Sequence, residues 1–242
     1  KESLLDQSLL IPFAILTAIS IVFIYSSSSV VADTDFGNQY FYLQRQLVAL
    51  SIGLIAGSLF LFIPISFYRE NGLLLILFAA FLLTLVFIPG IGVEKNGSLR
   101  WINIGFNIQP SEIAKVFVPI YLCGYCLRRK EQLETSWWGF IKPLILTSII
   151  SILLLLEMDL GATVVIFAIG IIILFIGGAK FNQLLLLFLV FLSTVILIAY
   201  FNEERWSRVV SFSNPWDDVG GSDYQLINAL VASVQGGFSG LG

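Results

Sequence analysis

The chain has no histidine and few charged residues. Its 242 residues include 13 Lys or Arg and 16 Asp or Glu, together 12% of the sequence. Without imidazole, any acid–base chemistry must use carboxylates, lysine or tyrosine. The net charge of −3 and the lack of a large basic stripe argue against a nucleic-acid partner.

Cysteine is also scarce. Cys123 and Cys126 lie in an apolar segment as Cys-Gly-Tyr-Cys. A zinc site needs further ligands and a thioredoxin-like redox site needs a βαβ context, and the sequence offers neither. We interpret both cysteines as small packing residues.

Long hydrophobic runs dominate the rest of the sequence. Apolar residues make up 57% of the chain and the mean hydropathy is +0.92, too much apolar surface for a water-soluble domain of this size. We predict a single all-α polytopic membrane domain over residues 1–242, with a large extracytoplasmic loop after the seventh span. Spans need about 17 to 25 apolar residues. The predicted spans are 9–25, 47–65, 72–88, 111–127, 141–156, 161–175 and 183–200.

Lysine and arginine in the short loops predict the orientation. With a cytoplasmic amino terminus, the inner side would carry Lys1, Arg69, Arg128, Arg129, Lys130, Lys142 and Lys180. The outer side would carry Arg45, Lys95, Arg100, Lys115, Arg205 and Arg208. The basic cluster at 128–130 favours this orientation, with a cytoplasmic amino terminus, because it directly adjoins a span. The three longest connections, 26–46, 89–110 and the segment after Tyr200, would then lie outside, where we expect function.

The connection 89–110 has a clear pattern. Ile102, Ile104, Phe106 and Ile108 alternate with small or polar residues, which predicts an extended segment. Pro110 is predicted to be the first residue of the next helix, with a carboxylate in its first turn.

Charged residues in that helix need partners. Gln109, Glu112 and Lys115 are spaced by three and share a face. A lysine about one turn inside the bilayer is costly unless it is paired or reaches the interface. Asp159, at the turn between the fifth and sixth spans, is on the same predicted side. We therefore predict a Lys115–Asp159 ion pair, which either only pins helices together or also serves function.

The segment 205–225 is the most polar part of the chain, with two arginines, two tryptophans and three aspartates. It is either a solvated loop with aromatic anchors or the place of the chemistry. After Asp223, residues 224–235 have one apolar and one polar face and predict an amphipathic helix.

Four motifs occur in order along the chain. They are Asn96-Gly97-Ser98-Leu99-Arg100-Trp101-Ile102, Gln109-Pro110-Ser111-Glu112-Ile113-Ala114-Lys115, Glu157-Met158-Asp159-Leu160-Gly161, and Asn214-Pro215-Trp216-Asp217-Asp218 with Gly221-Ser222-Asp223-Tyr224-Gln225. Together they resemble the SEDS family of bacterial cell-wall polymerases, the FtsW and RodA type, over essentially the whole chain. The Asn-Pro-Trp sequence resembles the division-type branch. The family continues through further helices, so the resemblance implies that its C-terminal part is missing here.

The resemblance implies a peptidoglycan glycosyltransferase of the bacterial cytoplasmic (inner) membrane. Such an enzyme polymerises lipid II during cell division, working with a class B penicillin-binding protein and other division proteins. The family's catalytic aspartate, on the extracytoplasmic side, falls on Asp218. Val219 and Met158 stand where the family has proline, and Asp223 where it has glycine; no reactive group is lost, but the loop beside Asp218 is expected to be less rigid.

The implied reaction joins a sugar hydroxyl to an anomeric carbon and expels a lipid pyrophosphate. Asp218 is our candidate general base, and the adjacent Asp217 is the alternative. Cationic side chains would bind the pyrophosphate, and polar ones would line the groove. The candidates for these roles are Arg205, Arg208, Arg100, Lys95, Gln109 and Glu112. No cofactor is assigned, and a requirement for a divalent cation is left open.

Two other functions compete with polymerisation. In a lipid-linked precursor transporter (flippase), Glu112, Lys115 and Asp159 would line the path, but the chain has neither an inverted repeat nor broken helices. In a non-catalytic scaffold of the division machinery, the loop carboxylates would be dispensable.

Overall fold

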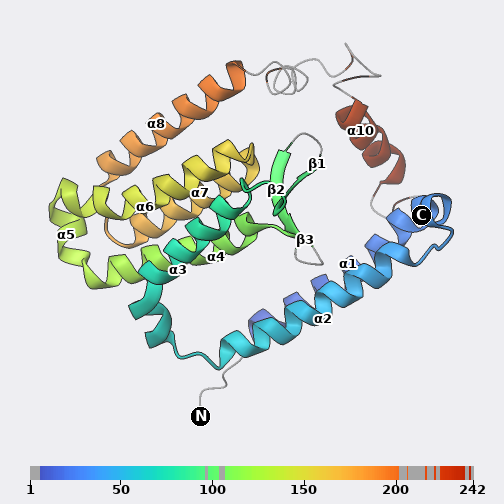
Figure 1. Ribbon diagram of the computed structural model, residues 1–242, viewed down its shortest axis with the longest axis horizontal. Helices are drawn as coiled ribbons and strands as arrows, with labels where there is room; N and C mark the ends of the chain where they lie inside the picture. The colour runs from blue at the N-terminus through green and yellow to red at the C-terminus, as the bar shows by residue number, and fades with distance from the viewer. Residues whose placement is uncertain are drawn as a thin grey trace. The chain divides into compact units, whose positions relative to one another are not determined.

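The computed structural model describes residues 6–95, 98–103, 107–201, 206, 216, 221, 224–237 and 240. Most of them are helical (Figure 1). The chain forms two compact units, Lys1–Ile63 with Ser207–Gly242, and Pro64–Trp206.

The first unit contains α1 (Gln7–Phe36), α2 (Phe41–Leu61) and α10 (Tyr224–Gly236). The prediction that a loop begins at residue 26 is wrong, because α1 continues for 30 residues. Hydroxyls in this polar stretch bond back one turn: Ser28 Oγ donates to the Ile24 carbonyl at 2.6 Å. Such bonds satisfy the hydroxyls inside a helix. The helix ends at Gly37, whose φ of 64° suits glycine, and leaves a connection of residues 37–40.

Aromatic pairs join α1 to α2. Phe36 stacks on Phe41 with ring centroids 3.9 Å apart, and Tyr25 stacks on Tyr40 at 5.4 Å. The predicted helix after the polar segment is confirmed as α10. Its position at a membrane interface stays a prediction.

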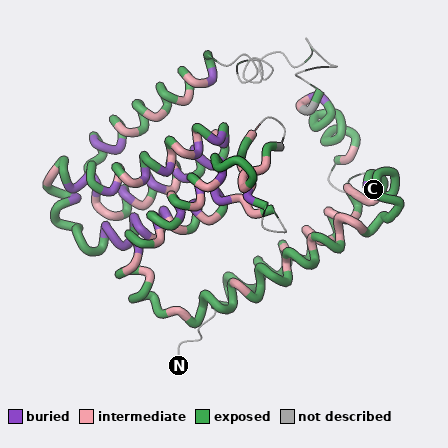
Figure 2. Tube along the Cα trace, viewed as in Figure 1, coloured by how far each residue is buried: buried purple, intermediate pink, exposed green. Residues whose placement is uncertain are grey.

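The second unit contains six helices and a small sheet among its described residues. The helices are α3 (Ile65–Leu85), α4 (Pro110–Arg128), α5 (Lys130–Thr135), α6 (Trp137–Leu156), α7 (Leu160–Ile176) and α8 (Phe181–Tyr200). Buried residues concentrate in α3, α4, α6 and α7, which pack side by side (Figure 2). Their core includes Ile76, Leu83, Val118, Leu122, Ile150, Leu154, Ile166 and Leu174.

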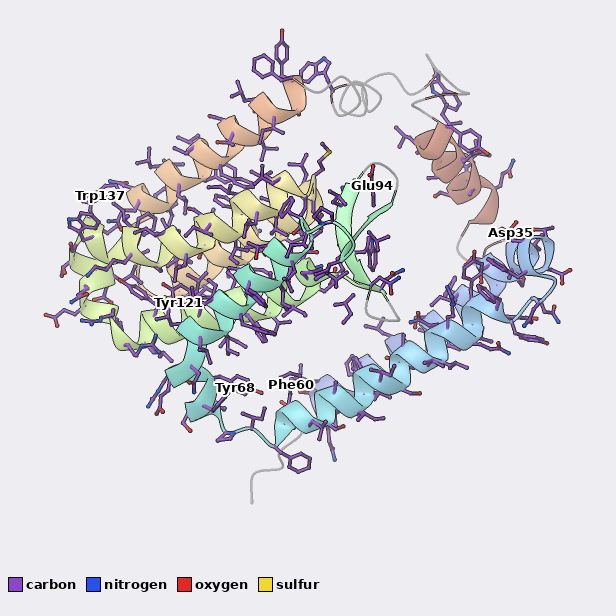
Figure 3. The ribbon with its side chains drawn as sticks, viewed as in Figure 1. Asp35, Phe60, Tyr68, Glu94, Tyr121 and Trp137 are labelled. Atoms are coloured by element: carbon purple, nitrogen blue, oxygen red, sulfur yellow. The ribbon has the colours of Figure 1, made fainter. Side chains whose placement is uncertain are left out.

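A glycine allows α3 and α4 to approach closely. A Cβ at Gly72 would lie 3.2 Å from Cα of Tyr121, which is labelled in Figure 3. Membrane helices commonly use small residues in this way, because packing rather than water exclusion holds them together.

The sheet connects α3 to α4. Its strands are β1 (Gly92–Lys95), β2 (Ser98–Asn103) and β3 (Asn107–Ile108), antiparallel in the order β1-β2-β3. Ile102 is buried and pairs with Gly92 on one side and Ile108 on the other. The predicted extended conformation is confirmed for the described part, and residues 104–106 lie outside it.

The prediction of a polytopic helical membrane protein is confirmed, but the count of seven spans is not. All seven predicted segments coincide largely with helices. By length and composition, five of the described helices can cross a membrane: α1, α2, α3, α6 and α8. α7 has only 17 residues, and α4 begins with polar and charged ones.

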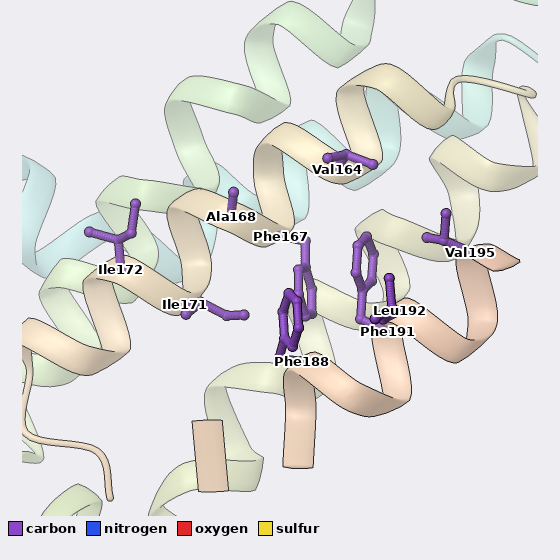
Figure 4. Close-up of a pocket in the computed structure, with 9 residues that line it drawn as sticks. All are labelled: Val164, Phe167, Ala168, Ile171, Ile172, Phe188, Phe191, Leu192 and Val195. Carbon is purple, nitrogen blue, oxygen red and sulfur yellow. The ribbon is translucent and has the colours of Figure 1, made fainter. Parts of the chain in front are cut away.

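An apolar pocket of about 470 Å³ lies between α7 and α8 (Figure 4). Phe167 and Phe191 stack in it with ring centroids 3.5 Å apart. Its lining is wholly apolar, so it suits hydrocarbon and contributes nothing to polar chemistry.

Candidate functional site

The buried carboxylate of Asp159 begins α7. Its Oδ1 accepts a hydrogen bond from the backbone N–H of Ala162 at 3.1 Å, and Thr163 Oγ1 donates to its carbonyl at 2.8 Å. Asp159 is therefore the N-cap of the helix, where a carboxylate satisfies an otherwise unpaired N–H and interacts with the positive end of the dipole.

The start of α4 supplies two more donors to the same carboxylate. Gln109 Nε2 and Ser111 Oγ each lie 3.1 Å from Asp159 Oδ2. Ser111 is completely buried. As predicted, Pro110 is the first residue of α4, so the two side chains flank the helix start. Neutral donors thus join the beginnings of α4 and α7.

The predicted ion pair between Lys115 and Asp159 is wrong. Lys115 Nζ lies 2.6 Å from Oε1 of Glu112, one turn earlier on the same helix. The Glu112 side chain is 61% exposed, so this local pair forms near solvent. The Asp159 oxygens meanwhile accept from Gln109, Ser111 and the backbone, which compensates their burial without a cation.

Arg100, on β2, stabilises the turn between α6 and α7. Its guanidinium donates to the carbonyl oxygens of Glu157, at 3.5 Å from Nε, and of Met158. Met158 has a φ of 59°, a left-handed conformation that costs energy for a residue with a side chain. The motif around Arg100 is therefore attached directly to the motif around Asp159. Its predicted role in binding pyrophosphate stays a prediction.

Glu157 is a buried carboxyl that was not among the predicted site residues. Its residue is fully buried, and neither carboxyl oxygen has a hydrogen-bond partner among the described residues. Burial raises the pKa of Glu157 to about 8, and the negative charge of Asp159 adds to this rise, whereas Arg100 opposes it. The buried site therefore favours the protonated form of Glu157. In the sequence, Glu157 directly follows the apolar run that forms α6. This position was the one sequence feature that could have predicted a carboxyl buried away from water.

These residues form what we call the polar cluster: Arg100, Gln109, Ser111, Glu112, Lys115, Glu157 and Asp159. Asp218, Asp217, Arg205 and Arg208 lie outside the described residues, and only the backbone of Lys95 is described, at the end of β1. In the described part of the chain, no three Cys, Asp or Glu residues come close enough to hold a metal ion.

Comparisons with known proteins agree on one family. A family model described as cell cycle protein, FTSW_RODA_SPOVE, matches residues 6–242. A protein named probable peptidoglycan glycosyltransferase FtsW, from Pseudomonas fluorescens, is 42% identical over 239 residues, which are 98% of this chain and 59% of the relative. A protein of the same name from Saccharophagus degradans is 40% identical over 98% of this chain and 62% of its own length.

Solved structures show the same fold. A chain from a structure of a peptidoglycan synthase complex that coordinates polymerization and crosslinking matches with a TM-score of 0.64 and 26% identity, over 88% of this chain and 64% of that one. The rod shape determining protein RodA of Thermus thermophilus matches with a TM-score of 0.58 and 25% identity, over 89% of this chain and 74% of its own.

The chain spans about three fifths of the length of these two curated relatives. The family match nevertheless covers every residue of the polar cluster and the whole of the polar segment 205–225. The chain belongs to the FTSW_RODA_SPOVE family of cell cycle proteins.

Proposed function

We propose that this chain belongs to a peptidoglycan glycosyltransferase that polymerises lipid II into glycan strands during cell division. One observation carries the proposal: the polar cluster unites three of the four motifs. Arg100 contacts the turn before Asp159, at residues 57 and 58 positions further along the chain, and Gln109 donates to Asp159 itself, 50 positions away. The names of the curated relatives support the same activity.

In the proposed reaction, a sugar hydroxyl of one lipid II molecule attacks the anomeric carbon of another. The new glycosidic bond forms as the bond from that carbon to the pyrophosphate oxygen breaks. The hydroxyl proton passes to Asp218, the proposed general base, and the lipid pyrophosphate leaves as an anion. Arg205, Arg208 and Lys95 are proposed to bind this anion, because its charge grows as the bond breaks.

The polar cluster has a positioning role in this proposal. Asp159 holds the beginnings of α4 and α7 together through Gln109 and Ser111. Arg100 holds the turn before α7, and its remaining N–H donors can contribute to the pyrophosphate site. The exposed Glu112–Lys115 pair adds a polar edge that can meet the sugar.

The chain is a multi-pass protein of the bacterial inner membrane. We propose that the polar cluster and Asp218 act on its outer side, where glycan strands are assembled. A structural relative comes from a complex that couples polymerization to crosslinking. We therefore propose a class B penicillin-binding protein as the crosslinking partner, together with other division proteins.

A chimera tests the proposal. Residues of this chain replace the matching part of the Pseudomonas fluorescens relative, which supplies the remaining length. The purified chimera should convert lipid II into glycan strands, and Asp218→Asn should abolish this. Transport of lipid II between leaflets without polymer would favour a flippase. Full division activity in cells without the loop carboxylates would favour a scaffold, and either result contradicts the proposal.

A further inference from the structure

The end of the second unit opposite to the polar cluster gathers five elements. The Arg128 guanidinium, at the end of α4, donates to the carbonyl of Arg69 near the start of α3. Lys180, in the α7–α8 turn, donates from Nζ to the Thr135 carbonyl of α5 at 3.3 Å. Tyr125 donates to the carbonyl of Gly139 on α6 at 2.7 Å. These contacts bring chain segments far apart in sequence to one end of the helices.

This end is strongly basic. We call it the basic end, and its cations are Arg69, Arg128, Arg129, Lys130, Lys142 and Lys180, all exposed. The acidic residues at this end of the same elements are Glu70, Glu131 and Glu134. Within the described part of the chain, only one of the six cations forms an ion pair: Lys130, with its Nζ 3.8 Å from Glu134. The excess of positive charge is therefore not neutralised by the protein itself.

Two tryptophans lie at the start of α6, one turn before Lys142 in the sequence. Trp137, labelled in Figure 3, and Trp138 are the first two residues of α6, and they are 51% and 66% exposed. Adjacent exposed tryptophans are typical of the headgroup level of a bilayer, where the ring meets lipid and the indole N–H meets polar groups.

An apolar stripe continues from the tryptophans along α6. Ile141, Ile145 and Ile149 are spaced by four, so they share one face of the helix. Their exposed fractions are 39%, 51% and 44%. Lys142 lies next to the first of them in sequence. Cations, interfacial rings and an apolar stripe thus occur together at this end, and they match the phosphate, the glycerol region and the acyl chain of a phospholipid.

We propose that the basic end binds the phosphate of an anionic phospholipid, with an acyl chain along the isoleucine stripe of α6. A general excess of cations on one side of a membrane would attract anionic lipid loosely. The exposed tryptophans and stripe beside the unpaired cations make a defined site for one headgroup and its chain. The proposal does not depend on the glycosyltransferase reaction.

Lipid titration of the purified chain in neutral detergent tests the site. Phosphatidylglycerol should raise the thermal unfolding temperature in a saturable way, and phosphatidylcholine with the same acyl chains should not. Arg129→Gln and Lys142→Gln should each weaken the apparent affinity about fivefold, equivalent to about 1 kcal/mol. Lys130→Gln should cost less, because Glu134 already neutralises part of its charge.

Matched variants keep the test decisive even where a cation variant fails to fold. Glu131→Gln removes an exposed negative charge from the same end, so it should strengthen phosphatidylglycerol binding. Replacing Trp137 and Trp138 with leucine should weaken binding while leaving the charge unchanged. Equal stabilisation by phosphatidylcholine, no gain from Glu131→Gln, or equal stabilisation by free glycerol phosphate at the same concentration would each overturn the proposal.

Discussion

The Ser111 hydroxyl lies 3.1 Å from Oδ2 of Asp159, and both side chains are buried. This bond joins residues 48 positions apart and connects the start of α4 to the start of α7. A buried carboxylate depends on such donors, since each unmet acceptor has a desolvation cost. Loss of one donor therefore affects two helices.

The coupling between Ser111 and Asp159 is our first prediction. Ser111→Ala should destabilise the protein by about 1 to 3 kcal/mol, because a buried carboxylate oxygen loses a donor. A double-mutant cycle with Asp159→Asn should give an interaction of about 0.5 to 3 kcal/mol. Unfolding in mixed detergent micelles measures both quantities.

Lys115 provides the matched control for this cycle. It pairs with Glu112 rather than with Asp159, so Lys115→Ala and Asp159→Asn should be additive within about 0.5 kcal/mol. Coupling to Lys115 as strong as that to Ser111 would contradict the arrangement described here.

Protonation of Glu157 predicts a pH dependence. Its raised pKa of about 8 means that the folded protein keeps a proton that the unfolded chain releases above its ordinary pKa. Stability should therefore be highest at low pH and fall as pH rises toward about 8, by about 1.4 kcal/mol per pH unit for this group. Glu157→Gln removes this contribution, so its unfolding free energy relative to wild type should rise with pH over this interval.

Glu94 supplies the control for the pH experiment. It is an exposed carboxylate on β1 (Figure 3), so Glu94→Gln removes one negative charge without altering a buried site. Parallel pH profiles of wild type and Glu157→Gln would show that the buried carboxyl does not hold its proton.

Gly72 is predicted to be intolerant of a side chain. A Cβ there would approach backbone Cα of Tyr121 at 3.2 Å, so Gly72→Ala should destabilise the α3–α4 pair by about 1 to 3 kcal/mol. Gly57, in α2, has nothing within 4 Å of an added Cβ. Gly57→Ala should be neutral or stabilising by about 0.5 to 1 kcal/mol, since alanine favours helix. Equal unfolding free energies for the two variants would exclude a close approach.

Asp218 is predicted to carry the general-base step. In the chimera, Asp218→Asn keeps the shape of the side chain but cannot accept the proton, so the polymerisation rate should fall about 10²- to 10⁴-fold. Asp217→Asn is the matched control and should lose much less. If Asp217→Asn is instead the inactive variant, the base is the neighbouring carboxylate.

The side of the membrane is open to direct labelling. After both native cysteines are replaced, Gln132→Cys, on α5 at the basic end, should be protected from an impermeant thiol reagent in intact cells. Ser213→Cys should react, because we predict that its segment lies outside. The reverse pattern would place the polar cluster and Asp218 on the cytoplasmic side.

The sequence by itself determined the membrane class, the positions of most helices and the start of α4. Hydrocarbon excludes unpaired backbone groups, so a long apolar run becomes a helix whatever its neighbours are. Pro110 starts α4 and the alternation around Ile102 forms β2 because proline geometry and the two-residue period are local. The four motifs were likewise legible without a structure.

Only the tertiary structure decided which groups meet at the polar cluster. Spacing placed Lys115 and Glu112 on one face, but it did not show that Glu112 would be the nearer partner. Asp159 is satisfied by Ser111 and Gln109 from another helix, and Glu157 is buried by packing around the α6–α7 turn. Partner choice and desolvation depend on distances between elements far apart in sequence, which local periodicity does not contain.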